Sequence, residues 1–206
     1  TGTALASVLL GDANPSGKLP FTFPARLEDV GAHKLGEYPG NKEELAHSKN
    51  NGDTINEIYR EDIFVGYRWA DKEKTKPLFP FGHGLSYTTF DISKGRLSKN
   101  VISTNQTVTF KANVKNTGKC EGTEVVQVYV RKVGDKEGPV KTLRAFRSIP
   151  LKAGKSSVVS IDLSPRTFEF FDPETNTMRI LPGDYEIMYG NSSETLPGNK
   201  LSIRLK

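Results

Sequence analysis

The chain has 206 residues, of which 35% are hydrophobic and 26% are charged, and its formal net charge is +5. This composition can form a hydrophobic core and excludes wholesale disorder, and no apolar run approaches the roughly 18 residues that a membrane-spanning helix needs. The basic excess lies after residue 90, where 19 Lys and Arg stand against 12 Asp and Glu, but these residues are scattered as on the solvated face of a sheet, so we expect no nucleic-acid partner.

The first 24 residues indicate a helix, a turn and a short strand. Residues 3–10 (TALASVLL) are helix formers with an apolar stripe, and the glycine and NPSG turn that follow would end the helix. In KLPFTFP, residues 18–24, apolar and polar side chains alternate, which predicts a short strand with prolines at an edge or an end. One helix and one strand bury too little surface to fold alone, so we interpret this segment as the end of an α/β unit.

The start of the chain predicts a piece of a longer protein or a processed form. Its first residue is Thr rather than Met, and the apolar run Ala4–Leu10 lacks the basic leader of a signal peptide. Any signal peptide is therefore expected upstream.

The middle of the chain changes composition twice. Residues 25–58 are poor in apolar side chains and rich in Gly, Asn, Lys and Glu, which predicts a long surface loop. Apolar and aromatic residues return at 58–69. Residues 77–90 (PLFPFGHGLSYTTF) then combine aromatics, which favour burial, with Pro and Gly, which interrupt helices and strands. We interpret this stretch as a packed joint between two bodies, where Gly82 and Gly84 let the backbone bend.

After residue 90 the apolar residues recur with period two, which predicts strands. Clear alternation occurs in TVTFKANV, EVVQVYV, SSVVSIDL, DYEIMYG and KLSIRL, and LRAFRSIPL (143–151) adds a less regular strand. Strands separated by Gly, Asn and Pro turns over about 115 residues indicate an antiparallel β-sandwich. The predicted fold is therefore mainly β: an α/β remnant at 1–87, including the loop, and a sandwich at 88–206.

No metal or phosphate motif is visible. His33, His47 and His83 lie far apart, and the lone Cys120 leaves no Cys pair to join them. Phosphate-binding glycine loops are also absent. We expect no metal and no cofactor.

Candidates for nucleophilic or acid–base chemistry are weak. Residues 84–88 (GLSYT) come within one residue of a nucleophile elbow around Ser86, but a turn serine explains them more simply. Glu61 and Asp62 stand near aromatic residues, yet the charged edge of a short element explains them equally well. The Arg68-Trp69 pair could stack on a sugar, although a buried Trp is usually part of a core. The sequence assigns no catalytic residue.

Four blocks of the chain resemble the C-terminal end of a glycoside hydrolase family 3 enzyme, most of all its bacterial β-glucosidases. They are GTALASVLLGDANPSGKLPFTFP, YREDIFVGYRWADKEKTKPLFPFGHGLSYTTF, VKNTGKCEGTEVVQVYV and LPGDYEIMYG. The resemblance covers essentially the whole chain in the expected order. One departure is Asp62, where many relatives have Gly.

The resemblance implies three bodies: a (β/α)₈-like barrel, an α/β sandwich and a fibronectin type III-like domain. Residues 1–87 would be the tail of the α/β sandwich, and residues 88–206 would be the fibronectin type III-like domain. It also implies a retaining mechanism with an Asp nucleophile and a Glu acid/base, both upstream of this chain. No position here matches either motif, so the fragment alone is expected to be inert, whereas the whole enzyme would act on terminal β-linked glucose or xylose.

Several roles remain open for the sandwich: a structural brace joined through Phe79–Tyr87, a loop reaching the active site, or a separate carbohydrate-binding module. The last would need a row of exposed aromatics, for which Phe168, Phe170 and Phe171 are the candidates. An immunoglobulin-like adhesion domain fits the fold but not the attached α/β remnant. By analogy with bacterial relatives we expect a periplasmic or secreted enzyme.

Overall fold

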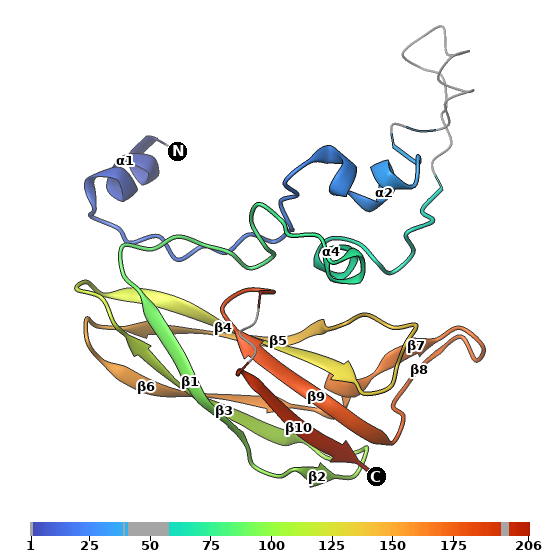
Figure 1. Ribbon diagram of the computed structural model, residues 1–206. Helices are drawn as coiled ribbons and strands as arrows, with labels where there is room; N and C mark the ends of the chain where they lie inside the picture. Colours follow the sequence, from blue (N-terminus) through green and yellow to red (C-terminus); the bar gives the residue numbers. More distant parts are fainter. Residues whose placement is uncertain (1, 39, 41–57, 195–197) are drawn as a thin grey trace, which may run out of the picture.

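The computed structural model describes residues 2–38, 40, 58–194 and 198–206. A β-sandwich forms its main body, and an N-terminal segment of short helices and extended chain lies across one side of it (Figure 1). Within the described residues, no helix is both long and apolar enough to cross a membrane.

In the described part of the chain, two antiparallel sheets and a separate hairpin make up the sandwich body. The three-stranded sheet has the order β1-β3-β6, and the five-stranded sheet has the order β2-β10-β9-β4-β5, in which only the short β2–β10 pair is parallel. The bounds are β1 (Phe90–Leu97), β2 (Val101–Ile102), β3 (Val108–Asn116), β4 (Gly122–Lys132), β5 (Thr142–Leu151), β6 (Ser156–Leu163), β7 (Phe170–Asp172), β8 (Thr177–Arg179), β9 (Gly183–Gly190) and β10 (Lys200–Leu205). A short helical turn, η2 (Pro165–Phe168), precedes the β7–β8 hairpin.

The core lies between the two sheets and is built by the side chains that alternate inward. Phe110 and Val114 of β3 are fully buried, as are Val128 of β4 and Ile187 of β9. The predicted antiparallel sandwich is therefore confirmed. The irregular period of β5 has a structural cause, because the pairing of β4 with β5 shifts register where Arg144 has no partner.

The N-terminal segment contains four short helical elements among the described residues: α1 (Gly2–Leu10), η1 (Leu27–Asp29), α2 (Gly31–Lys34) and α4 (Tyr67–Glu73). The predicted helix at 3–10 is present as α1, and none of its residues is buried. The segment 25–58, predicted as a surface loop, holds η1 and α2, and its residues 41–57 lie outside the described residues.

The predicted strand at 18–24 is wrong. This stretch instead runs beside residues 78–83 as an irregular ribbon, with a single β-bridge between Phe23 and Phe79. Its backbone bonds include Leu19 N to His83 O at 2.8 Å and Phe23 N to Phe79 O at 2.8 Å. Prolines in both stretches have no N–H to donate, so a continuous ladder cannot form.

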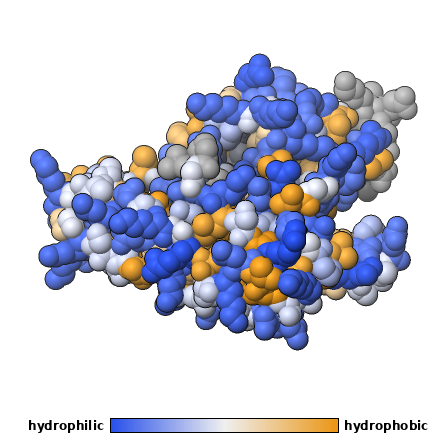
Figure 2. All heavy atoms as spheres, turned by 60° about the horizontal axis from the view of Figure 1, so that its bottom comes forward, coloured by the Kyte–Doolittle hydropathy of each residue, from blue (hydrophilic) through white to orange (hydrophobic). Residues whose placement is uncertain are grey.

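The surface differs between the two parts. Figure 2 shows hydrophilic residues over most of the visible face, with apolar residues in small groups between them. Larger apolar exposure occurs in the N-terminal segment, where the side chains of Leu5 and Leu9 are 60% and 72% exposed. Scattered exposed apolar residues are ordinary, but a helix with no buried residue lacks a packing partner.

Candidate functional site: the seam on strand β4

Strand β4 is covered on both faces. Val126, Val128 and Val130 face the sandwich core, while Gln127 and Tyr129, on the opposite face, are also buried. The cover on that second face is the N-terminal segment. We call the contact between residues 14–24 and 67–88 on one side, and β4 with its flanking residues on the other, the seam.

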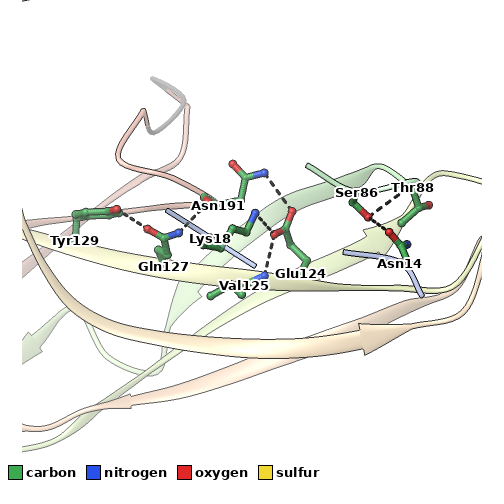
Figure 3. A network of polar contacts seen from close by, with 9 residues as sticks. All are labelled: Asn14, Lys18, Ser86, Thr88, Glu124, Val125, Gln127, Tyr129 and Asn191. Atoms are coloured by element: carbon green, nitrogen blue, oxygen red, sulfur yellow. Dashed lines mark hydrogen bonds and ion pairs between the residues drawn. The ribbon is translucent and has the colours of Figure 1, made fainter. Parts of the chain in front are cut away.

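Aromatic rings and one buried amide form the middle of the seam. The ring of Tyr67 in α4 lies 5.3 Å from that of Phe81 and 5.8 Å from that of Tyr129, centroid to centroid. Burial raises the pKa of Tyr129, so its hydroxyl stays protonated and donates to Gln127 Oε1 at 2.5 Å. Gln127 Nε2 in turn donates to the carbonyl of Asn191 at 2.8 Å (Figure 3). The buried polar atoms are thus paired rather than available to a ligand.

A buried ion pair lies at the start of β4. Lys18 Nζ is 2.7 Å from Glu124 Oε1, and the two side chains are only 16% and 5% exposed. The Val125 N–H also donates to Oε1 at 2.8 Å, and Asn191 Nδ2 donates to Oε2 at 3.1 Å (Figure 3). Glu124 is therefore held by three donors from three parts of the chain.

A second ion pair lies near the other end of β4. Lys141 Nζ donates to both carboxylate oxygens of Asp71 in α4, at 2.7 and 2.6 Å. Lys141 directly precedes Thr142, which pairs with Val130. Burial raises the pKa of Asp71 above its ordinary value, and this outweighs the opposite effect of Lys141.

A polar corner joins the ribbon to the first sheet. Asn14 Oδ1 accepts from Ser86 Oγ at 2.9 Å (Figure 3). It also accepts from the Tyr87 N–H at 2.8 Å. Thr88 Oγ1 donates to Asn116 Oδ1 at 2.6 Å, and Asn116 Nδ2 donates to two backbone carbonyls. The corner is satisfied internally, as expected for a structural joint.

Two glycines allow the ribbon to lie this close. A Cβ at Gly82, whose φ is +78°, would stand 2.3 Å from Gln127 Nε2. A Cβ at Gly84 would stand 2.3 Å from the carbonyl oxygen of Gly17. The predicted bend at these glycines thus coincides with close contacts that leave no room for a side chain.

Two small hollows adjoin the seam. One, of about 290 Å³, is lined by Thr22, Tyr67 and Asp71 among others. The second, of about 300 Å³, is lined by Lys18, Ser86 and Glu124 among others. In the second hollow the charged lining residues, Lys18 and Glu124, are bound to each other. The lining of the first holds Lys74, Lys76 and Glu194 in addition to Asp71, which is bound to Lys141.

Comparison with known proteins agrees with this architecture. The family model described as the glycosyl hydrolase family 3 C-terminal domain matches residues 1–87, and the model of the fibronectin type III-like domain matches residues 124–193. A β-glucosidase of Bacteroides ovatus is 42% identical over 96% of this chain and 25% of its own length. The chain belongs to glycoside hydrolase family 3.

Two further relatives match nearly the whole chain. A xylan 1,4-β-xylosidase of Xylanibacter ruminicola is 38% identical over 99% of this chain and 20% of its own length. The crystal structure of the β-glucosidase DesR from Streptomyces venezuelae in complex with D-glucose superposes with a TM-score of 0.82 at 35% identity, over 98% of this chain and 24% of that one. The chain therefore corresponds to the C-terminal part of these enzymes and spans between 20% and 25% of their length.

Of the three histidines, the two in the described residues belong to different elements of the structure. His33 lies in α2, whereas His83 stacks near Phe79 at 5.1 Å in the ribbon, and His47 lies outside the described residues. Among the residues the structure describes, no group of three His, Cys, Asp or Glu side chains could hold a metal ion. Cys120 is half-buried, and its Sγ donates to the carbonyl of Tyr87.

The weak acid–base and nucleophile candidates occupy structural positions in this family 3 chain. Ser86 is bonded to Asn14 in the polar corner. Glu61 is buried, and it adjoins Gly31 as the Trp69 ring does, since a Cβ at Gly31 would lie 3.3 Å from Glu61 Cβ and 3.0 Å from that ring. Within the described part of the chain, Glu61 Oε2 has no hydrogen-bond partner. Asp62 has a φ of +53°, the left-handed region that favours glycine, which accounts for the Gly expected there in relatives.

The aromatic candidates for sugar stacking do not form a platform. Trp69 is buried, and its Nε1 donates to the carbonyl of Asp29 at 3.1 Å. Phe168 is buried in the core and Phe170 is half-buried, while Phe171 is 56% exposed. These phenylalanines therefore do not present a row of exposed rings.

Sequence reasoning missed the seam residues of β4. The alternation in EVVQVYV predicted that its valines face the core, but it gave no sign that Gln127 and Tyr129 on the other face are buried as well. A buried face needs a neighbour, and period-two alternation within β4 does not reveal one that comes from residues 14–24 and 67–88. A tyrosine at an outward position was the signal that could have indicated a second contact surface.

Proposed function

We propose that this chain is part of a retaining, exo-acting β-glycosidase that removes terminal β-linked glucose, and that it acts there as a structural brace without the catalytic carboxylates. The 42% identity with the Bacteroides ovatus β-glucosidase over nearly the whole chain carries this proposal. In the complete enzyme, two carboxylates on parts outside this chain act as nucleophile and acid/base.

The ion pairs formed by the acidic residues of the seam support a structural role for this chain. Glu124 and Asp71 are both taken up in ion pairs across the seam. The exposed apolar side chains of α1 indicate that this helix packs against another part of the enzyme, because Leu9 and Leu10 are 72% and 78% exposed. The partner that we propose for this face is the remainder of the enzyme, its barrel and the rest of its α/β sandwich.

A β-xylosidase is the second candidate for the complete enzyme. The xylan 1,4-β-xylosidase of Xylanibacter ruminicola matches 99% of the chain at 38% identity, close to the value for the β-glucosidase. The seam and the sandwich serve either enzyme equally, because neither holds the groups that contact the sugar in this proposal.

We also propose the division at residues 87 and 88 between the α/β remnant and the fibronectin type III-like domain. Strand β1 begins at Phe90, which agrees with this boundary. A bacterial origin and a periplasmic or secreted location are proposed from the resemblance alone, and relatives also include fungal β-glucosidases.

Hydrolysis of p-nitrophenyl β-glucoside and β-xyloside tests the proposal. We expect no release above background from the 206-residue chain at high concentration, and turnover by the complete enzyme, with the ratio of the two substrates deciding the sugar. Turnover by the 206-residue chain that is lost in Glu61→Gln would overturn the brace and place the active site at residues 58–71. Asp184→Asn, a surface carboxylate, is the control.

A further inference from the structure

We infer that the Lys18–Glu124 and Asp71–Lys141 ion pairs fix the orientation of the N-terminal segment on the β-sandwich and contribute little to the free energy of unfolding. This inference rests on the proposed brace, since orientation matters when the N-terminal segment carries the rest of an enzyme. It assigns positioning roles to four residues that touch no substrate.

The two pairs are placed far apart on the seam. Glu124 lies at the start of β4, and Lys141 stands beside the strand's other end, where Val130 pairs with Thr142. Six residues of strand separate these points, which corresponds to about 20 Å.

Single hydrogen bonds also cross the seam, such as those from the Leu143 N–H to Tyr67 Oη at 2.9 Å and from the Ser193 N–H to the carbonyl of Phe81 at 2.8 Å. The ion pairs stand at the two ends of the seam, so they resist rotation of one body on the other with the longest lever arm.

The ring contacts at the centre of the seam determine the angle between the two bodies less strictly than the ion pairs do. The rings of Tyr67, Phe81 and Tyr129 meet in tilted and edge-on arrangements, and such contacts are favourable over a range of offsets. Hydrogen bonds of an ion pair are directional by comparison. Glu124 is already held by the Val125 N–H and by Asn191, so its Oε1 offers the Lys18 ammonium a single fixed location.

Burial explains why these pairs add little stability. The side chains of Lys141 and Asp71 are only 9% and 22% exposed, so forming the pair removes most of their hydration. Desolvation of this kind offsets much of the Coulomb attraction, and buried pairs are often replaced by apolar residues without loss of stability. The raised pKa of Asp71 agrees, because its environment as a whole disfavours the charged form.

The test replaces each pair with apolar residues in the 206-residue chain, as K18M/E124L and D71L/K141M. We expect the urea midpoint of unfolding to stay at the wild-type value in each double variant. Residual dipolar couplings of the α4 amides should fit the same alignment tensor as those of β3 and β9 in the wild type, and should cease to fit it when both pairs are replaced. R204M/D184N, which removes an exposed pair on the sandwich, is the matched control and should change neither result.

Two outcomes would overturn the inference: α4 couplings that still fit the sandwich tensor without both pairs, or a large loss of urea midpoint in the apolar variants. The charge-swapped D71K/K141D guards against a variant that simply misfolds. Compared with D71K alone, the swap should restore the α4 couplings, and failure to restore them while the sandwich stays folded counts against a directional pair.

The complete enzyme provides a second readout. Replacement of both pairs should lower kcat/KM for p-nitrophenyl β-glucoside several-fold at an unchanged melting temperature. If the wild-type enzyme hydrolyses neither aryl glycoside, the proposed function fails, whereas the dipolar couplings still decide the orientation. Unchanged kcat/KM together with altered couplings would contradict the link between orientation and activity.

Discussion

In the β-sandwich, the apolar side chains of two sheets meet in a closed core, whereas in α1 and the neighbouring ribbon they face outward. Phe110 is fully buried, while Leu9 is 72% exposed, and both are large apolar residues. The sandwich therefore holds its own stabilising contacts, and the N-terminal segment is held mainly by the seam. The difference teaches that the two parts of one chain can depend on different partners for their stability.

The largest effect that we expect is in hydrogen exchange. Amides of residues 105–130 should exchange through global unfolding, while those of α1 and of the ribbon around Phe21 should exchange through local opening and be orders of magnitude less protected. Mass spectrometry of peptides from the two regions measures this. Equal protection in a monomer would contradict the comparison; association through Leu5, Val8 and Leu9 would instead raise protection with concentration.

Truncating a large apolar side chain should lower the unfolding free energy by several kcal/mol more in the sandwich than in α1. Phe110→Ala removes a ring at the centre of the sandwich and should cost about 3–5 kcal/mol of unfolding free energy. Leu9→Ala, the matched control on α1, should change it by less than about 0.5 kcal/mol. Urea unfolding followed by tryptophan and far-UV signals gives both values. A comparable loss in the two variants would show that α1 is packed in the isolated chain.

The close approach at the seam should be visible in a pair of glycine variants. Gly82→Ala places a methyl group against Gln127, and we expect about 1–3 kcal/mol from this overpacking in addition to backbone strain. Gly11→Ala shares the positive φ, at +84°, but has open space around it. Its thermal shift therefore measures the strain alone. Identical shifts would mean that the ribbon moves away from β4 freely.

The smallest effects concern pH. Arg204 holds the pKa of Asp184 below its ordinary value, so the folded state binds fewer protons, and this stabilisation, present at neutral pH, is lost as the pH falls through the lowered pKa. Asp184→Asn should therefore slightly reduce the fall of the melting temperature on acidification. Asp71, whose pKa is raised by burial, contributes with the opposite sign: its stabilisation is lost as the pH rises through the raised pKa, so Asp71→Asn should remove that fall. Melting curves at several pH values compare the two variants.

The sequence predicted the sandwich because most of its long strands alternate between apolar residues that face the core and polar residues that face outward. Phe110, Val128 and Ile187 alternate with polar residues, and this local pattern needs no knowledge of the partner strand. The shorter strands β2, β7 and β8 were not predicted because two or three residues give no measurable period. The eight-residue strand β1 was not predicted either, because the register shift between Ser93 and Arg96 interrupts its alternation. KLPFTFP failed for another reason: it alternates correctly, but its prolines limit the backbone bonds to a ribbon.

The seam could be predicted only in part. Residues 77–90 were identified as a joint because aromatics and glycines coincide there, and the bend at Gly82 is where the structure brings the chain onto Gln127. The ion pairs could not be found, since Lys18 and Glu124 are separated by more than 100 positions and each resembles an ordinary surface residue. Long-range electrostatic pairing leaves no periodic trace in a single sequence.

The double burial of β4 also sets how this part of the chain tolerates mutation. A strand with one solvated face accepts many residues at every second position, as β3 should at Lys111 and Lys115, which are exposed. From Val126 to Val130 every residue is buried, so this stretch contains no solvent-exposed position at which many different residues are tolerated. Variation in this family 3 chain should therefore avoid five consecutive positions of β4. Substitutions at Gln127 and Tyr129 should require matching changes on the N-terminal segment, and substitutions at the three valines should require matching changes in the sandwich core.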